Sequence, residues 1–213
     1  MTAVSRPYVW RRALSLLLAC GAVALGWVAY GHHPSPAAQT AALPTLGLVE
    51  PFALTERDGS RVDLARLHGQ IWVANFMFTR CTGPCPLMSG YVKTLQKHFA
   101  TEPRLRFVSI STDPAHDTPA ALRAYAERFG ADPQRWLFLT GDKTTVVHLS
   151  RDVFKLAAGD DPGMHSTRFV LVDADGRIRG YYDSRDPDFQ ARLQADAEAL
   201  ARALPATAAG KGV

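Results

Sequence analysis

Two cysteines four positions apart are the residues of this sequence best suited to chemistry. The segment FTRCTGPCP (78–86) contains Cys81 and Cys85, with Pro84 and Pro86 on either side of the second cysteine. Such a pair can form a structural disulfide, work as a redox dithiol or supply half of a metal site. Two thiolates are a soft donor set that selects copper(I) or zinc, usually with histidine as a third ligand.

The elements around the pair predict where the two thiols lie. IWVANFMF (71–78) is a continuous apolar run that suits a strand buried on both faces. After it, LMSGYVKTLQKHF (87–99) has helical periodicity, with Leu87, Tyr91, Leu95 and Phe99 on one face. The cysteines therefore fall where a strand leads into a helix N-terminus, a place that favours a thiolate.

The two prolines refine this placement. A helix tolerates proline only in its first turn, where the missing N–H is not needed. Pro84 and Pro86 therefore predict that Cys85 lies in the first helical turn, with Cys81 on the loop just before it. In that arrangement the two sulfurs can approach one another, either to form a Cys81–Cys85 disulfide or to bind a metal.

A third ligand has to come from elsewhere in the chain. The histidine candidates in the folded part are His68, His98, His116, His148 and His165. His68, His98 and His148 have ordinary surface or core explanations, and His116 sits in the loop DPAHDTP. His165 differs because DPGMHSTRF is a loop that leads straight into a strand, from which a side chain can reach another loop. His165 is therefore the histidine that the sequence favours as a ligand.

The remaining pattern alternates strands with helices. Two short extended pieces flank Asp58-Gly59, further strands are predicted at 105–112 and 136–140, and a hairpin turns at Asp175-Gly176. The predicted helices cover 119–129, with Thr118 as its cap, then 144–156 and 188–203. This order predicts an α/β sandwich of thioredoxin type, in which helices flank a central mixed sheet.

Charge argues against nucleic acid as a partner. The 213 residues carry a formal charge of +4, and 47% of them are hydrophobic. Three basic residues, Arg6, Arg11 and Arg12, precede the first apolar run, which leaves 21 basic against 20 acidic residues in the rest of the chain. A nearly neutral folded part lacks the excess of basic residues that a nucleic-acid-binding surface needs.

An uncharged run, ALSLLLACGAVALGWVAY (13–30), is long enough to cross a bilayer as a helix. The arginines before it predict a cytoplasmic N-terminus (1–12) and place everything after the run on the far side. We expect a linker at 31–47, one folded domain at 48–204 and a flexible tail at 205–213. The predicted location is the bacterial inner membrane, single-pass, with the soluble domain in the periplasm.

Other interpretations of the apolar run compete with this anchor. A cleaved signal peptide has a shorter apolar core and a small-residue cleavage site. The LLAC segment ending at Cys20 resembles a lipoprotein box, but ten apolar residues follow the cysteine. A mitochondrial transit peptide would be longer and rich in serine as well as arginine. The signal anchor fits the run best.

Three segments together resemble a known family. FMFTRCTGPCP, VSISTDPAHDTP and GMHSTRFVLVDADGRI are similar to the signature blocks of the SCO/SenC family of membrane-anchored copper proteins. The resemblance extends from residue 45 to residue 202. It departs from the family's pattern at Thr82-Gly83-Pro84, where an Asp-Val pair is common, and at Met164, where an acidic residue is common.

The resemblance implies a thioredoxin-like fold and a copper site. It implies Cys81, Cys85 and His165 as ligands of Cu(I) or Cu(II), with Asp113 and Asp117 as supporting residues near the copper loop. It also implies a role in assembling the binuclear copper centre of cytochrome c oxidase, as a metallochaperone that delivers copper, as a reductant of the target's cysteines, or both. The expected partner is the copper-bearing subunit of that oxidase or another copper protein.

An enzyme of another class remains the alternative. In a membrane-anchored thiol–disulfide oxidoreductase, Cys81 would attack and Cys85 would resolve, and no histidine would be needed. A peroxiredoxin-like peroxidase fits less well, because Thr79 stands two positions before Cys81 where that class has Thr or Ser three before. The sequence leaves open whether the protein is an enzyme, and it does not determine the oligomeric state.

Overall fold

The computed structural model describes residues 43–156 and 166–205. The predicted membrane span (13–30), most of the predicted linker and tail, and His165 lie outside the described residues. Within the two described ranges, no helix is both long enough and apolar enough to span a bilayer. Residues 43–47, expected as the end of the linker, already contact the sheet, since the Leu46 N–H donates to the Ile178 carbonyl at 2.8 Å.

The described chain is built on one mixed sheet of eight strands in the order β1-β8-β7-β4-β5-β6-β2-β3. The strands are β1 (Gly47–Leu48), β2 (Ala53–Glu56), β3 (Arg61–Asp63), β4 (Ile71–Met77), β5 (Leu105–Ser111), β6 (Trp136–Thr140), β7 (Arg168–Val172) and β8 (Arg177–Asp183). The centre consists of β4, β5 and β6, which are parallel and almost entirely buried. Continuous apolar runs such as 71–77 suit a strand that is covered on both faces.

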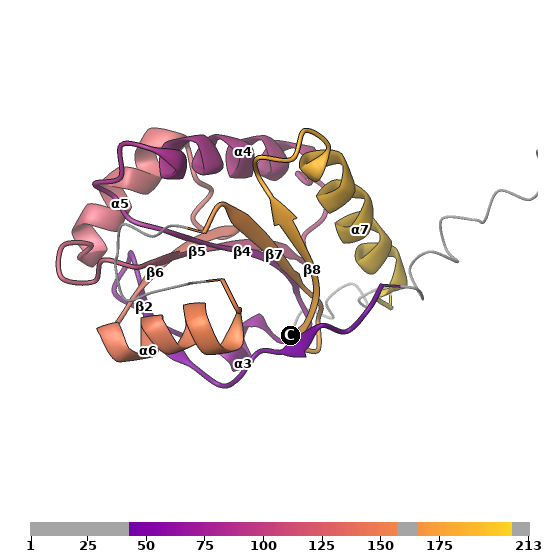
Figure 1. The fold of residues 1–213 in the computed structure, drawn as a ribbon, viewed down its shortest axis with the longest axis horizontal. Coiled ribbons are helices and arrows are strands. Elements are labelled where there is room, and N and C mark those ends of the chain that lie inside the picture. The colour runs from indigo at the N-terminus through magenta and orange to yellow at the C-terminus, as the bar shows by residue number, and fades with distance from the viewer. Residues whose placement is uncertain (1–42, 157–165, 206–213) are drawn as a thin grey trace, which may run out of the picture. The chain divides into compact units, whose positions relative to one another are not determined.

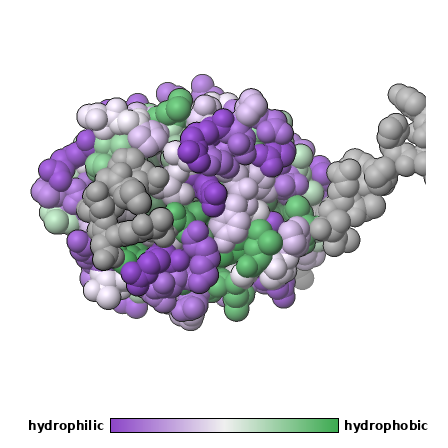
Figure 2. Space-filling model, viewed as in Figure 1, coloured by the Kyte–Doolittle hydropathy of each residue, from purple (hydrophilic) through white to green (hydrophobic). Residues whose placement is uncertain are grey.

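Helices cover both faces of the sheet (Figure 1). They are α3 (Leu64–Leu67), α4 (Pro84–His98), α5 (Pro119–Phe129), α6 (Lys143–His148), a π-helical turn η1 (Leu149–Val153) and α7 (Phe189–Ala203). Helices α4, α5 and α7 lie on one face, and α3 and α6 lie on the other. Figure 2 shows that the surface in this view is largely hydrophilic, with apolar residues gathered mainly on the side where the described chain begins.

The core has two layers, one on each side of the sheet. One layer packs Val73, Phe107 and Phe138 against apolar side chains of α4, α5 and α7. The other packs Trp72 and Phe76 with residues of α6 and η1. Because successive strand residues point to opposite faces, each central strand supplies both layers. The predicted α/β sandwich with a central mixed sheet is confirmed for the described residues.

The strand directions bring several chain segments to one end of the sheet. Parallel strands β4 and β5 both end there, at Met77 and Ser111, and the Thr112 N–H donates to the Met77 carbonyl at 2.9 Å. Strand β7 pairs with β4 in the antiparallel sense, so it begins at this same end, at Arg168. The loops after β4 and β5 and the segment before β7 therefore meet.

The helix predicted at 144–156 differs from the structure. An α-helix covers only Lys143–His148, and the chain then widens into the π-turn η1. Phe154 follows this turn and packs edge-on against Trp72 and Phe76, at centroid distances of 6.0 and 5.6 Å. The π-turn lies directly before Phe154, the residue that packs against the sheet.

Helix α5 begins as its sequence predicts, and its cap can be tested. The Thr118 hydroxyl accepts a hydrogen bond from the Ala121 N–H at 3.2 Å, and Pro119 occupies the first helical position. We expect Thr118→Ala to lower the free energy of unfolding by about 1 kcal/mol, because one N–H of the first turn loses its partner. Chemical denaturation measures this, with the exposed Thr101→Ala as control. An equal loss in both variants would contradict the capping role.

Candidate functional site

The two cysteines lie where strand β4 passes into helix α4. Gly83 precedes the helix, Pro84 is its first residue and Cys85 its second. Cys81 lies on the preceding loop, where its N–H donates to the Phe78 carbonyl at 3.3 Å. The placement predicted from the two prolines is therefore confirmed, and helix α4 starts three residues earlier than its apolar pattern begins.

The two thiols touch each other and are largely withdrawn from solvent. Both are reduced in the structure, Cys81 is 7% exposed and Cys85 is 0% exposed. Burial, followed by a hydrogen bond with Cys81, raises the pKa of Cys85 to about 12. The expectation that the helix N-terminus favours a thiolate is wrong for apo Cys85. Burial outweighs the helix, and two of the first three helical residues are prolines, which have no N–H to offer.

This difference in burial predicts an order of reaction. We expect brief treatment of the reduced protein with iodoacetamide to label Cys81 well before Cys85, since only Cys81 reaches the surface. Peptide mapping by mass spectrometry measures the two rates. In denaturant the two cysteines should react at similar rates, and labelling of Cys85 first in the native protein would contradict this geometry.

A buried carboxylate fixes the loop that leads to the cysteines. Asp117 is 0% exposed and accepts three kinds of hydrogen bond. The Thr79 N–H donates to it at 3.1 Å, the Thr79 hydroxyl at 2.5 Å and the Ser111 hydroxyl at 2.6 Å. We call this arrangement the Thr79–Asp117–Ser111 tie. It joins the loop after β4 to the strand β5 and the loop after it.

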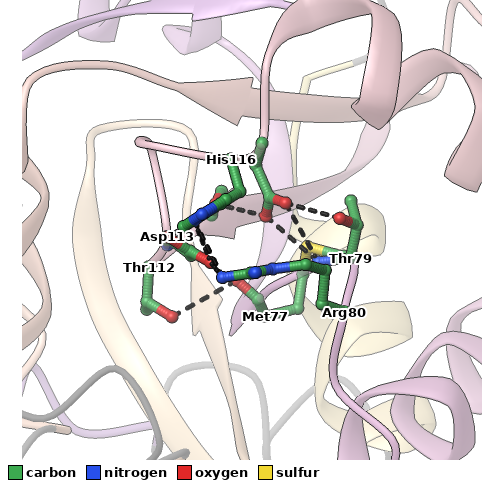
Figure 3. Close-up of polar contacts among 8 residues, drawn as sticks. Met77, Thr79, Arg80, Thr112, Asp113 and His116 are labelled. Carbon is green, nitrogen blue, oxygen red and sulfur yellow. Dashed lines mark hydrogen bonds and ion pairs between the residues drawn. The ribbon is translucent and has the colours of Figure 1, made fainter.

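A second contact between the same loops lies nearer the surface (Figure 3). The Arg80 Nη2 donates to Asp113 Oδ2 at 2.7 Å, and the Nδ1 of His116 lies 2.9 Å from Asp113 Oδ1. Burial alone would raise the pKa of Asp113, but the hydrogen bonds from His116 and Arg80 together outweigh it and lower that pKa. Asp113 is therefore an ionised group that holds two half-exposed side chains, His116 and Arg80, the second of which directly precedes Cys81.

On its inner side the pair faces a tyrosine. The Tyr125 hydroxyl of α5 lies 3.0 Å from the hydroxyl of Ser89, which follows Cys85 by one turn of α4. Burial raises the pKa of Tyr125 to about 12, and the proximity of the acidic groups Cys85 and Cys81 acts in the same direction. Tyr125 is thus a neutral, buried polar group on the protein side of the two sulfurs.

The structure separates the histidine candidates. His165 lies outside the described residues, but Ser166 and Thr167 precede β7 at the sheet end that carries the cysteine loop. His98 and His148 lie elsewhere, where they contact Glu198 at 2.8 Å and Glu50 at 3.1 Å. Among the described residues alone, no group of three or more His, Cys, Asp or Glu side chains is arranged to hold a metal ion.

The sequence reasoning did not assign roles to several residues that the structure brings to this site. Thr79, Arg80 and Ser111 shape the loop, and Tyr125 lies behind the thiols. Their positions at the ends of predicted parallel strands were the available signal for Thr79 and Ser111, because such ends meet at one edge of a sheet. Asp113 and Asp117, expected near the loop, do lie against it.

Comparison with known proteins agrees with this architecture. The sequence model of the SCO1/SenC family matches residues 41–201. The SCO1 protein homolog of Bacillus subtilis is 33% identical over 141 residues, which cover 63% of this chain and 73% of that protein. The solved structure of BsSco is 30% identical to this chain with a TM-score of 0.66, and the match covers 75% of this chain and 97% of BsSco. BsSco is described as a member of the Sco family of cytochrome c oxidase assembly proteins in which a disulfide switch was identified.

A solved structure of a relative with copper bound is also similar to this chain. Yeast Sco1 with copper bound is 25% identical with a TM-score of 0.61, covering 77% of this chain and 98% of its own. The predicted thioredoxin-like fold is confirmed by these structures, as is the resemblance stated from the three sequence blocks. Since the family model matches well over half of the residues, this chain belongs to the SCO1/SenC family.

Proposed function

We propose that the protein binds copper through Cys81, Cys85 and His165 and helps to assemble the binuclear copper centre of cytochrome c oxidase. The observation that carries this proposal is the convergence at one sheet end. Cys81 on the loop after β4 and Cys85 in the first turn of α4 are in contact, and Ser166 and Thr167 lie at that same end of the sheet, just before β7. Two sulfurs and an imidazole suit Cu(I) and, with adjustment, Cu(II).

Copper is the cargo of this function. Thiols must lose their protons to bind it, so copper must displace the proton of Cys85, whose pKa burial raises to about 12. The target's cysteines would then displace Cys81 first, because it is the thiol that reaches the surface. The small exposed part of Cys81 gives a target access to the site and so permits this stepwise exchange of ligands.

The relatives support the same assignment. BsSco is described as belonging to a family of cytochrome c oxidase assembly proteins, and yeast Sco1 has been solved with copper bound. The two acids have supporting roles in this proposal. Asp117 holds the loop through Thr79, and Asp113 holds Arg80 beside Cys81.

The proposed setting is the outer face of the bacterial inner membrane. The apolar run at 13–30 and the arginines before it support a single-pass anchor, with the folded domain in the periplasm. In that oxidising compartment two thiols in contact need a metal or a reductant to stay reduced.

The second candidate function is thiol–disulfide exchange with the same target. The contact between Cys81 and Cys85, and the disulfide switch described for BsSco, favour it. The Cys81 thiolate would attack a target disulfide, and one target cysteine would leave as a thiolate. Cys85 would then attack the mixed disulfide, leaving a Cys81–Cys85 bridge and two reduced target cysteines.

Copper binding by His165→Ala separates the two functions. The full chain, reduced and free of oxygen, is loaded with copper, and its stoichiometry and Cu(I) affinity are measured by competition with a chelator. We expect one copper per wild-type chain and an affinity roughly tenfold or more lower for His165→Ala. His98→Ala is the matched control, because His98 contacts Glu198 near the end of α4. Wild-type affinity in His165→Ala would favour the dithiol oxidoreductase.

A further inference from the structure

One apolar side chain in the first turn of α4, close in sequence to the cysteines, is not part of the core. Leu87 shares its predicted helical face with Leu95, yet Leu87 is 57% exposed whereas Leu95 is 0% exposed. Leu46, Leu48 and Leu87 are the exposed large hydrophobic residues of the described part of the chain. Leu87 is two residues from Cys85, in the first turn of α4.

The stretch of chain that contains Leu87 is uncharged. No residue from Cys81 to Val92 carries a charge, and the first turn of α4 has no acidic residue, although the helix dipole favours one there. Thr82 is exposed, and Pro84, Pro86 and Tyr91 are partly exposed. We call Thr82, Pro84, Pro86, Leu87 and Tyr91 the thiol rim. Depletion of charge with apolar and aromatic residues at the centre is typical of a protein interface.

We propose that the thiol rim, centred on Leu87, is the surface on which a copper-accepting protein docks. This inference rests on the proposed function and names the part of the surface that recognises the target. The accessibility of the two sulfurs supports it. Because Cys81 is 7% exposed and Cys85 is 0% exposed, a target sulfur must come into close contact with this surface to reach either of them.

The occupant that fits is a folded domain that presents a cysteine on a protruding, largely uncharged loop. Such a loop would cover Leu87 while its sulfur meets Cys81. A small thiol such as glutathione reaches Cys81 without covering the rim. A protein partner and a small thiol should therefore respond differently to a change at Leu87.

The test uses a trapped exchange that needs no copper. The target is the copper-bearing domain of cytochrome c oxidase with one cysteine joined to thionitrobenzoate. The Cys81 thiolate attacks the target sulfur, the bond to thionitrobenzoate breaks, and the coloured thiolate leaves while a Cys81–target disulfide forms. Cys85→Ala in all variants prevents resolution. The glutathione–thionitrobenzoate disulfide is the small-molecule control.

We expect Leu87→Ser to slow the reaction with the protein target by about tenfold, while its reaction with the glutathione derivative stays within about twofold. Leu48→Ser is the matched control, since Leu48 is 65% exposed on β1 at the edge of the sheet, and it should change neither rate. The proposal is overturned if Leu87→Ser and Leu48→Ser behave alike, or if the parent protein reacts with the target no faster than with the glutathione derivative. Copper stoichiometry, measured separately, decides the proposed function.

Discussion

Replacing Cys81 with serine or Cys85 with alanine is expected to lower the Cu(I) affinity roughly a hundredfold or more. Residues that only support a metal ligand usually contribute ten- to a hundredfold, so a thiolate that binds the metal directly should contribute at least as much. A hydroxyl is also a hard donor that Cu(I) does not favour. Competition with a Cu(I) chelator, on reduced full-length protein without oxygen, measures the loss.

The third cysteine provides the control. Cys20→Ala changes a thiol within the apolar run at 13–30 and should leave both stoichiometry and affinity unchanged. Alanine is chosen at position 85 because Cys85 is fully buried, and a serine hydroxyl there would need a partner. Thermal unfolding of each variant checks that the fold persists. Full copper binding by either substituted protein would rule out the two-thiolate site.

Replacing Asp117 with alanine is expected to have the largest effect on stability, about 3 kcal/mol. The substitution leaves the Thr79 N–H and hydroxyl and the Ser111 hydroxyl without their acceptor in a buried place. Hydrogen bonds to a charged group contribute roughly 1.5–3 kcal/mol each, and a hydroxyl can turn toward another acceptor. Denaturant unfolding of the reduced protein measures the loss.

Two further variants sharpen this prediction. Asp117→Asn keeps one carbonyl acceptor of the same shape and should lose about half as much. Asp186→Ala removes an exposed carboxylate and should change stability by less than about 0.5 kcal/mol. If the tie also positions the thiols, Asp117→Ala will lower Cu(I) affinity, whereas Asp186→Ala will not. Equal stability of Asp117→Ala and the wild type would show that the tie contributes nothing.

Much of the fold was predictable because its elements have strong local signals. The apolar runs that became β4, β5 and β6 could be assigned without any tertiary information, and so could the Thr118-Pro119 start of α5. The π-turn at Leu149–Val153 could not, because its apolar spacing is that of an ordinary helix. What distinguishes it is the packing of Phe154 on Trp72 and Phe76, which joins segments some 80 residues apart.

In the site, too, features set by neighbouring residues could be predicted, and features set by residues distant in the sequence could not. Two prolines were enough to place Cys85 in the first turn of α4, since their effect is local. The partners of Thr79 and the exposure of Leu87 depend on how α4 and the loop after β5 pack together. The raised pKa of Cys85 could not be predicted, because the helix terminus is visible in a sequence, whereas the depth of burial is not.

The Thr79–Asp117–Ser111 tie has a consequence for repeated use of the protein. Neither cysteine is a donor to Asp117, so a change in the bonding of the thiols, whether to copper under the proposed function or to each other, removes neither the donors nor the acceptor of the tie. Under the proposed function, we expect the start of the cysteine loop at Thr79 to stay in place through each round of exchange, which would leave little reorganisation to slow the next. The rate of transfer by the protein would then be limited by how often it meets a partner. A molecule that has given up its copper would accept the next ion as readily as a newly folded one.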